Sequence, residues 1–328
     1  MIFAGSFWKK LAAALSCLCA ALTLAACDKS PERPVTIGTN LWIGYEPGYI
    51  ADVNKLYGDA DVSLRQYTSA TEAIQAFRNQ TVDIVALTLD EALMVRQSGI
   101  PIRVFLVADI SNGADVIMAR PGIASIEQLA GKRVAAEDSA VGDYLLSRAL
   151  QQHGMQNSDI TKIALPVDEM LGSYSSGAAD AVVSFEPLKS QLARAGAVKI
   201  FDSSKIPGEI VDVLVTREDF AKANPNVIAA VAKGWLAGAE LANGRSDAVL
   251  DTIARRLSLT RSEVEVALNE VTLPGVAENR TLLSGAANQI ELTSRKLMPM
   301  LEKRYGTRFT FGPGEILTAD FLPNGDVK

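Results

Sequence analysis

Residues Asp83 to Leu93 read DIVALTLDEAL and contain the pattern most diagnostic of the fold class. Its first half, residues 83–87, is a short and mostly apolar run of the kind found in buried strands. Thr88 follows, with Glu91 three residues later, which is the spacing of a capping box at the start of a helix. A buried strand that passes directly into a helix is the unit from which layered α/β domains are built.

The same strand-to-helix unit recurs from residue 35 to about residue 216. Strands are predicted over 35–41, 62–66, 83–87, 102–108, 116–119, 133–136, 160–165, 181–184, 198–201 and 210–215. Helices are predicted over 47–57, 69–77, 139–153, 168–175 and 186–195, in addition to the one that begins at Thr88. After Arg217 the pattern is helical, over 226–242, 246–257, 261–271 and 282–305. Repeated units with short connections predict parallel sheets covered by helices.

The first 27 residues have the pattern of an export signal. Lys9 and Lys10 precede an apolar run over 11–26, which is shorter than the ~20 residues of a membrane-spanning helix. The run ends in Leu-Ala-Ala-Cys27, which resembles the bacterial lipobox. We therefore expect residues 1–26 to be a signal peptide, Cys27 to carry a lipid, and residues 27–34 to form a short tether. The alternative is a plain secretory signal in which Cys27 is incidental.

Composition excludes several classes of function. Cys17 and Cys19 lie inside the predicted signal, so Cys27 would be the only cysteine of the mature chain, without an internal disulfide or a cysteine metal site. The single histidine, His153, argues against a histidine-based hydrolase and a multi-histidine metal site. Signal removal leaves 30 Lys and Arg against 38 Asp and Glu. The sequence has no basic stretch with interleaved aromatic residues, which argues against nucleic-acid binding.

Six stretches together resemble a known family. They read GTNLWIGYEP at 38–47, TLDEAL at 88–93, SNGAD at 111–115, GKRV at 131–134, FEP at 185–187 and IPGEIVDVL at 206–214. In this order and spacing they resemble the substrate-binding proteins of ATP-driven importers. The branch concerned serves nitrate, taurine and alkyl sulfonates, and the pyrimidine precursors of thiamine.

This resemblance implies an α/β fold of the periplasmic-binding-protein type II, with two Rossmann-like lobes joined by a two-strand hinge. Residues 35–110 and 213–328 would form the first lobe and residues 111–212 the second. The lobes of such proteins close on a ligand by hinge motion. Because open α/β sheets bind ligands beyond the carboxyl ends of their strands, the six stretches are expected at the cleft.

Two pairs of candidate ligand-binding residues follow predicted strands of the first lobe. Trp42 and Tyr45 come after the first strand and would form aromatic walls, although they could instead anchor the next helix in the core. Asp90 and Glu91 begin a helix. Glu91 could serve only the capping box with Thr88, and an acid such as Asp90 is also favoured there by the helix dipole.

Five further candidates belong to the predicted second lobe and its connections. Ser111 and Asp115 flank an Asn-Gly pair, which could equally form an ordinary turn. Ser139 could bind the ligand or cap a helix. Glu186 follows a strand, and Asp212 interrupts an apolar one. A buried carboxylate needs a partner, which the ligand or a nearby arginine could supply.

The charges in the six stretches limit the ligand. The acids Glu46, Asp90, Asp115, Glu137, Glu186 and Asp212 fall in or beside them, whereas Lys132 and Arg133 begin a strand nearby. A bare anion would meet mostly repulsion at such a site. We therefore expect a small polar solute that contains nitrogen or sulfur. It would carry an amine, an amidine or a ring-nitrogen donor, and it could be a zwitterion.

Three classes of function remain. The resemblance favours a monomeric solute-binding lipoprotein without cofactor, metal or catalysis, with a permease and an ATPase as partners. An enzyme of the pyrimidine-synthase type on the same fold would need a cysteine cluster and a histidine, and a sensor lipoprotein would be favoured by a fused signalling domain. Asp28 after Cys27 resembles an inner-membrane retention signal, which predicts anchoring at the periplasmic face of that membrane, or at the cell surface of a single-membrane host.

Overall fold

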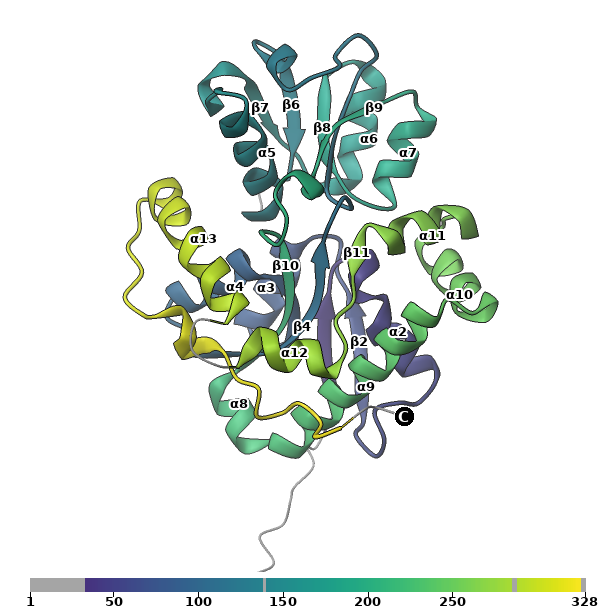
Figure 1. Ribbon diagram of the computed structural model, residues 1–328, viewed down its shortest axis with the longest axis vertical. Helices are drawn as coiled ribbons and strands as arrows, with labels where there is room; N and C mark the ends of the chain where they lie inside the picture. Colours follow the sequence, from purple (N-terminus) through teal and green to yellow (C-terminus); the bar gives the residue numbers. More distant parts are fainter. Residues whose placement is uncertain (1–32, 138–139, 285–287, 326–328) are drawn as a thin grey trace, which may run out of the picture. The chain divides into compact units, whose positions relative to one another are not determined.

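The computed structural model describes residues 33–137, 140–284 and 288–325. The predicted signal peptide, Cys27 and Ser139 lie outside these ranges. Residues Arg33–Lys328 form one compact unit, with two β-sheets and helices packed against them (Figure 1). The α/β class predicted from the alternation of strands and helices is confirmed.

The first sheet has six strands in the order β11-β4-β10-β3-β1-β2. Their bounds are Val35–Thr39 for β1, Val62–Gln66 for β2, Ile84–Thr88 for β3, Ile102–Ser111 for β4, Val211–Arg217 for β10 and Val271–Thr272 for β11. Strand β1 runs parallel to β2 and β3, whereas β10 is antiparallel to β3 and β4. All five residues of β3 are buried, as its continuous apolar pattern predicts.

The second sheet has five strands in the order β7-β6-β8-β5-β9. Their bounds are Val116–Ala119 for β5, Arg133–Ala136 for β6, Thr161–Ala164 for β7, Ala181–Ser184 for β8 and Val198–Asp202 for β9. Strand β6 is parallel to β7 and β8, and β5 is antiparallel to β8 and β9.

Both sheets are therefore mixed, and the prediction of parallel sheets was wrong for the strands at the two crossings. The chain leaves the first sheet at the end of β4 and enters the second as β5, and it returns from β9 into β10. A strand that enters a sheet from the side at which the neighbouring strands have their carboxyl ends must be antiparallel to those strands. This explains the antiparallel pairing of β5 with β8 and of β10 with β3. The lobe boundaries at residues 111 and 212 stay a prediction.

The helices mostly follow the predicted ranges. They are α2 (Glu46–Val53), α3 (Ala70–Arg78), α4 (Leu89–Gln97), α5 (Ala140–Gln152), α6 (Val167–Ser176), α7 (Leu188–Arg194), α8 (Glu218–Ala223), α9 (Pro225–Gly244), α10 (Asp247–Leu257), α11 (Arg261–Asn269), α12 (Val276–Leu283) and α13 (Gln289–Tyr305). Single 3-10 turns are η1 (Ile43–Tyr45), η2 (Glu127–Leu129), η3 (Asn157–Asp159), η4 (Ser203–Lys205) and η5 (Pro313–Ile316).

Two predicted helices in the last third differ from the structure in their bounds. The single helix over 282–305 is two helices, because α12 ends at Leu283 and the side chain of Asn288 caps α13 by accepting the Glu291 N–H at 2.9 Å. The helix over 261–271 ends at Asn269, and the next residues pair with β4 as the short strand β11.

Close packing of α2 against α9 fixes the segment that follows β1. A Cβ atom at Gly238 of α9 would lie 2.0 Å from the Pro47 carbonyl oxygen, and one at Gly48 would lie 2.4 Å from the Trp235 ring. The two helices approach this closely only because both positions lack a side chain. Trp235 is fully buried and meets the Tyr45 ring edge-on at 6.4 Å, so α9 holds the aromatic segment of residues 42–45 in place.

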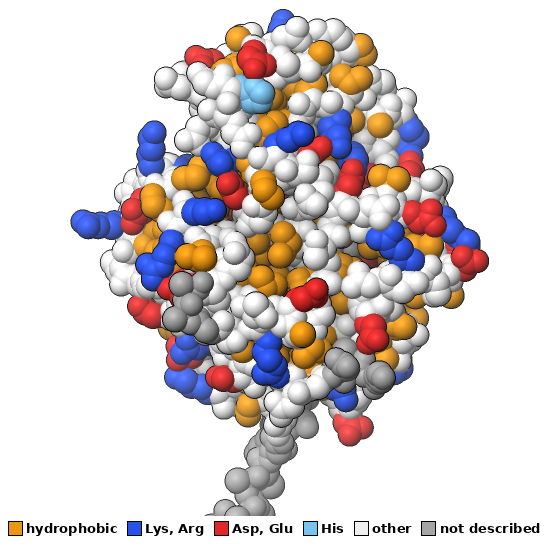
Figure 2. All heavy atoms as spheres, in the orientation of Figure 1, with side chains coloured by type: hydrophobic (Ala, Val, Ile, Leu, Met, Phe, Trp, Pro, Cys, Tyr) orange, Lys and Arg blue, Asp and Glu red, His pale blue; other side chains and the backbone are white. Residues whose placement is uncertain are grey.

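The surface gives two further observations. On the face shown in Figure 2, lysine and arginine side chains are interspersed with acidic ones, so this face has no continuous basic patch of the kind that binds nucleic acid. Within the described ranges, no helix is both long enough and apolar enough to cross a bilayer.

Candidate functional site

A cavity lies between the two sheets, where the carboxyl ends of their parallel strands face each other. From the first sheet and its connections it is lined by Asn40, Trp42, Tyr45, Thr88, Glu91 and Asp212, with Ala70 beside them. From the second sheet and the crossings it is lined by Asp115, Glu137, Val141, Phe185 and Ile210. An adjoining cavity shares Asp115, Glu137, Val141 and Phe185 with it.

Trp42 contributes to the cavity through a turn that follows β1. Its indole Nε1–H donates to Asp109 Oδ2 at 2.9 Å, and its ring meets Phe185 edge-on with centroids 5.6 Å apart. The turn needs Gly44, since a Cβ there would lie 1.8 Å from Asp109 Oδ2 and 2.5 Å from the Trp42 nitrogen. Trp42 is therefore both a cavity wall and a tie between the first loop and β4.

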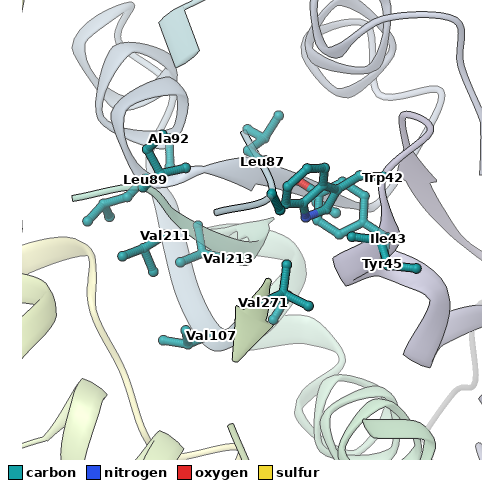
Figure 3. Packing of buried hydrophobic residues seen from close by; sticks show 14 of the residues in the cluster. Trp42, Ile43, Tyr45, Leu87, Leu89, Ala92, Val107, Val211, Val213 and Val271 are labelled. Atoms are coloured by element: carbon teal, nitrogen blue, oxygen red, sulfur yellow. The ribbon is translucent and has the colours of Figure 1, made fainter. Parts of the chain in front are cut away.

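Tyr45 closes the same turn. Its hydroxyl donates to Asp212 Oδ1, and the side chains of Trp42 and Tyr45 lie beside the apolar residues of the neighbouring strands (Figure 3). Burial, followed by the charge of Asp212, raises the pKa of Tyr45 well above its usual value. The phenol therefore remains a hydrogen-bond donor across the physiological pH range.

Asp212 and Asp109 are direct neighbours on β10 and β4. Both are buried. After burial, the charge of Asp109 is the largest effect that raises the pKa of Asp212. Burial raises the pKa of each, and the hydrogen bonds from Tyr45 and Trp42 offset this only in part. Two buried carboxyl groups side by side are not both ionised in the absence of a cation, so the pair holds at least one proton.

Glu91 and Asp90 begin α4. The N–H of the capping residue Thr88 donates to Glu91 Oε2 at 3.1 Å, which confirms the predicted bond between the cap and the third residue. Burial, followed by the charge of Asp90, raises the pKa of Glu91 to about 8. Burial also raises the pKa of Asp90. Glu91 lines the cavity and Asp90 does not.

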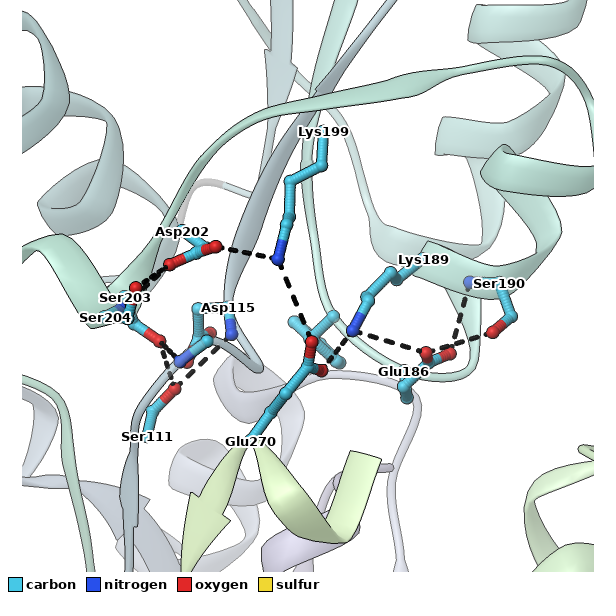
Figure 4. A network of polar contacts seen from close by, with 12 residues as sticks. Ser111, Asp115, Glu186, Lys189, Ser190, Lys199, Asp202, Ser203, Ser204 and Glu270 are labelled. Atoms are coloured by element: carbon cyan, nitrogen blue, oxygen red, sulfur yellow. Dashed lines mark hydrogen bonds and ion pairs between the residues drawn. The ribbon is translucent and has the colours of Figure 1, made fainter. Parts of the chain in front are cut away.

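Asp115 lies on the first crossing, which a small network of serines joins to the second. Ser111 Oγ and Ser203 Oγ are 2.7 Å apart, and the Asp115 N–H donates to Ser111 Oγ at 3.3 Å (Figure 4). The Ser111 hydroxyl, at the end of β4, thus contacts the second crossing at Ser203 in η4, and Ser111 does not line the cavity. Burial raises the pKa of Asp115 to about 6.

Glu186 lies behind the cavity wall. Its carboxylate accepts from the Ser190 N–H at 3.2 Å and from Ser190 Oγ at 3.0 Å, and Lys189 Nζ is 3.8 Å away. Lys189 in turn contacts Glu270, at the end of α11 (Figure 4). The partners that a buried carboxylate needs are therefore found within the protein.

The sequence-predicted candidates divide into two groups. Trp42, Tyr45, Glu91, Asp115 and Asp212 are brought together around the cavity. Asp90, Ser111 and Glu186 lie behind it, and Ser139 lies outside the described residues. Glu46, counted among the acids expected to face the cleft, instead pairs with Arg256 at 2.9 Å.

Several residues of the site were not singled out from the sequence, namely Asp109 and the lining residues Phe185, Asn40, Ala70, Val141 and Ile210. Asp109 lies at the end of β4, past residue 108, where the predicted strand stopped. Phe185 stands in the quoted FEP stretch but was not singled out. The long apolar run into Asp109 was the available signal, because an acid that continues a buried strand needs a partner.

The chemistry of the cavity is acidic and aromatic. None of the described residues that line it is lysine, arginine or histidine. Arg133, at the start of β6, pairs with Asp180 at 2.9 Å. Within the described part of the chain, no group of three or more histidine, cysteine, aspartate or glutamate side chains has the arrangement needed to hold a metal ion.

Comparisons with known proteins give relatives of one kind. The chain is 24% identical over 254 residues to the taurine-binding periplasmic protein of Escherichia coli, covering 76% of this chain and 78% of the relative. Its fold resembles that of the alkanesulfonate-binding protein SsuA from Xanthomonas axonopodis pv. citri bound to MOPS, with a TM-score of 0.71 at 16% identity, covering 88% of this chain and 97% of that one.

A third protein with a similar fold is a component of an importer. The ligand-binding component of an ABC-type import system from Staphylococcus aureus, solved with zinc bound, has a TM-score of 0.76 at 11% identity, covering 90% of this chain and all of the other. These proteins are named as binding proteins and not as enzymes, in agreement with the prediction of a non-catalytic chain. The two-sheet fold and these neighbours confirm the predicted fold class. The sequence model of the NMT1-like family matches residues 28–258, and the chain therefore belongs to that family.

Proposed function

We propose that this chain is the solute receptor of an ATP-driven importer. The observation that carries the proposal is the cavity between the two sheets, lined by the aromatic rings of Trp42, Tyr45 and Phe185 and by buried carboxyl groups. A concave site with a few convergent polar groups is the usual form of a small-molecule site. The names of the relatives, a taurine-binding protein and an importer component, favour transport over other uses of such a site.

The proposed ligand contacts come from residues that line the cavity. Trp42, Tyr45, Glu91, Asp115 and Asp212 would touch the solute, a small polar compound that contains nitrogen or sulfur. Ser111, Asp90 and Glu186 would hold these residues in position from behind the cavity wall. Ser139 remains a predicted ligand-binding residue. The two crossings, at residues 112–115 and 203–210, would act as the hinge, because they carry the chain between the sheets.

The proposal includes export and a lipid anchor on Cys27. A receptor held at the membrane stays close to the permease and ATPase that it serves. The apolar run before Cys27 and the proline-containing tether after it support this part of the proposal. The corresponding test is the fractionation described in the Discussion.

Binding can be tested by thermal unfolding of the exported protein, purified in mild detergent, against amines, sulfonates, pyrimidines and nitrate. A solute present at 100 times its dissociation constant should stabilise the folded state by about 2.7 kcal/mol. The variant Asp212→Asn should lose this stabilisation, whereas Asp180→Asn, which changes the pair with Arg133 at the far end of the second sheet, should keep it. If no class of solute raises the unfolding temperature, the receptor proposal is wrong.

A further inference from the structure

The cavity has a charge imbalance that its own residues do not resolve. Glu91, Asp115 and Asp212 bring carboxyl groups to its wall, and each is at least nine-tenths buried. Among the described lining residues there is no basic side chain. A buried carboxylate without a counter-ion is costly, so the site needs protons or a cation from outside the wall.

Two carboxyl oxygens at this wall have no hydrogen-bond partner among the described residues. They are Glu91 Oε1 and Asp115 Oδ2. Glu91 is 3% exposed and Asp115 is 6% exposed. The other oxygen of Glu91 is already used by the Thr88 N–H, so the free oxygen is the one left for a ligand. An unmade hydrogen bond at a buried acceptor costs about 1–3 kcal/mol, and a bound N–H donor would remove that cost.

The nearest basic side chains are already engaged. Lys189, the cation that acts on Asp115, contacts Glu270 and lies 3.8 Å from Glu186. Arg304, which acts on Asp90, contacts Asp143. Neither lines the cavity, so neither provides the positive pole that a sulfonate or nitrate would require.

The remaining walls also suit a cation. The rings of Trp42 and Phe185 stand nearly perpendicular, at 83°, and both line the cavity beside Asp115. Aromatic rings attract a positively charged nitrogen through their electron-rich faces. The indole N–H of Trp42 is not available to an anion, since it is bonded to Asp109.

We propose that the solute of this cleft is a compact organic cation, an amine or amidine, whose N–H groups bind the free carboxyl oxygens of Glu91 and Asp115. This rests on the proposed receptor function and gives its ligand a charge class. The cation would replace protons that the carboxyl groups hold when the site is empty. The charged groups that act on Glu91 are Asp90, Glu137 and Asp212, and those that act on Asp115 are Asp90, Asp109, Asp212 and Lys189. Acids therefore outnumber bases around both carboxyl groups.

The test compares probes with one carbon skeleton by isothermal titration at pH 8. Ethylamine carries the cation alone, taurine carries both charges, and ethanesulfonate carries the anion alone. Acetamidine serves as the amidine probe. Ethylamine and acetamidine should bind, taurine should bind at least about tenfold more weakly, because its sulfonate would lie among carboxyl groups, and ethanesulfonate should not bind.

Variants locate the effect at the two oxygens. Glu91→Gln and Asp115→Asn keep the shape of each side chain, and each should weaken ethylamine binding by about tenfold or more, because a hydrogen bond to a charged group is lost. Asp83→Asn is the control, since Asp83 is equally buried but lies just before β3, at the end of that strand remote from the cavity, where Arg33 pairs with it at 2.8 Å. It should leave the affinity unchanged.

Each outcome decides between the two proposals. Taurine or ethanesulfonate binding as tightly as ethylamine overturns the cation proposal and leaves the receptor function standing. Failure of both cations to bind also overturns it. Equal affinities for Glu91→Gln, Asp115→Asn and the wild-type protein would remove the two oxygens from the site. The wider solute panel described above then tests the receptor function separately.

Discussion

Asp109 and Asp212 lie directly opposite each other on β4 and β10, and both are buried. Each accepts a hydrogen bond from one aromatic side chain of the loop after β1, Trp42 for Asp109 and Tyr45 for Asp212. The strands β4 and β10 are also the two that continue toward the second sheet. The carboxyl pair therefore connects the aromatic wall of the cavity to both crossings.

Tyr45→Phe should lower the free energy of unfolding by about 1–3 kcal/mol, because it removes the donor to the buried Asp212 carboxyl group. Urea unfolding gives the measurement. Tyr67→Phe is the matched control, since the Tyr67 hydroxyl is buried and has no hydrogen-bond partner within the described ranges. That change should be neutral or stabilising. Equal losses in the two variants would contradict the role given to the Tyr45 hydroxyl.

Gly44→Ala should both destabilise the protein and impair solute binding. The added Cβ would overlap Asp109 Oδ2 at 1.8 Å, and overpacking of this kind costs about 1–3 kcal/mol or more. Gly172→Ala, in the exposed part of α6 with nothing within 4 Å of the new Cβ, should be stabilising by up to about 1 kcal/mol. Calorimetric unfolding of both variants checks this, and a stable Gly44→Ala protein with normal binding would refute the tight turn.

The strand-to-helix alternation was readable because each buried strand is a short apolar run that ends at a polar helix start. Strand β3 and the cap at Thr88 illustrate this, and the cleft acids Glu91 and Asp115 follow from their positions after strands. The Ser111 hydroxyl was predicted to bind the ligand, and that role stays a prediction. In the structure the hydroxyl also contacts Ser203, 92 residues away, and nothing local in a sequence shows a contact that only tertiary folding creates.

Asp109 illustrates a second limit. Asp109, Ser111 and Asn112 are polar and resemble the beginning of a turn, so the strand was ended at residue 108. In the folded protein β10 pairs with β4 as far as Ile110, and this pairing extends the strand through the acid. The direction of β10, which makes the sheet mixed, also depends on where the chain returns from the second sheet.

The solute-free protein should lose the stabilisation associated with Glu91 as pH rises. The pKa of this group is raised to about 8 when folded, so the folded state holds its proton more tightly than the unfolded chain does. The contribution is complete below about pH 4.5 and is lost as pH passes about 8. The change amounts to at most about 1.4 kcal/mol per pH unit.

The measurement is the difference in unfolding free energy between Glu91→Gln and the wild-type protein at pH 5, 6.5 and 8. The difference should move in favour of the variant as pH rises, because glutamine carries no charge to bury. Glu218→Gln is the control, since Lys222 and Arg103 hold the pKa of Glu218 below its usual value and the group is ionised throughout this range. A difference for Glu91→Gln that is constant with pH would contradict the buried, proton-binding site.

Cys27→Ala should release the protein from the membrane fraction into the soluble fraction of the envelope, because the lipid acceptor is lost. In a double-membrane host, Asp28→Ser should move the lipidated protein to the outer membrane. Fractionation with metabolic fatty-acid labelling measures both effects. Continued labelling of Cys27→Ala, or an inner-membrane location of Asp28→Ser, would contradict the anchor or the retention signal respectively.

The most direct test is a crystal structure of the protein grown with ethylamine or acetamidine, whichever binds more tightly. We expect the cationic nitrogen between the two sheets, at about 2.7–3.2 Å from carboxyl oxygens of Glu91 or Asp115, with Trp42 and Phe185 against the carbon atoms of the solute. A solute bound elsewhere, for example in the groove between Arg103, Lys222 and Phe321, would contradict the proposed site.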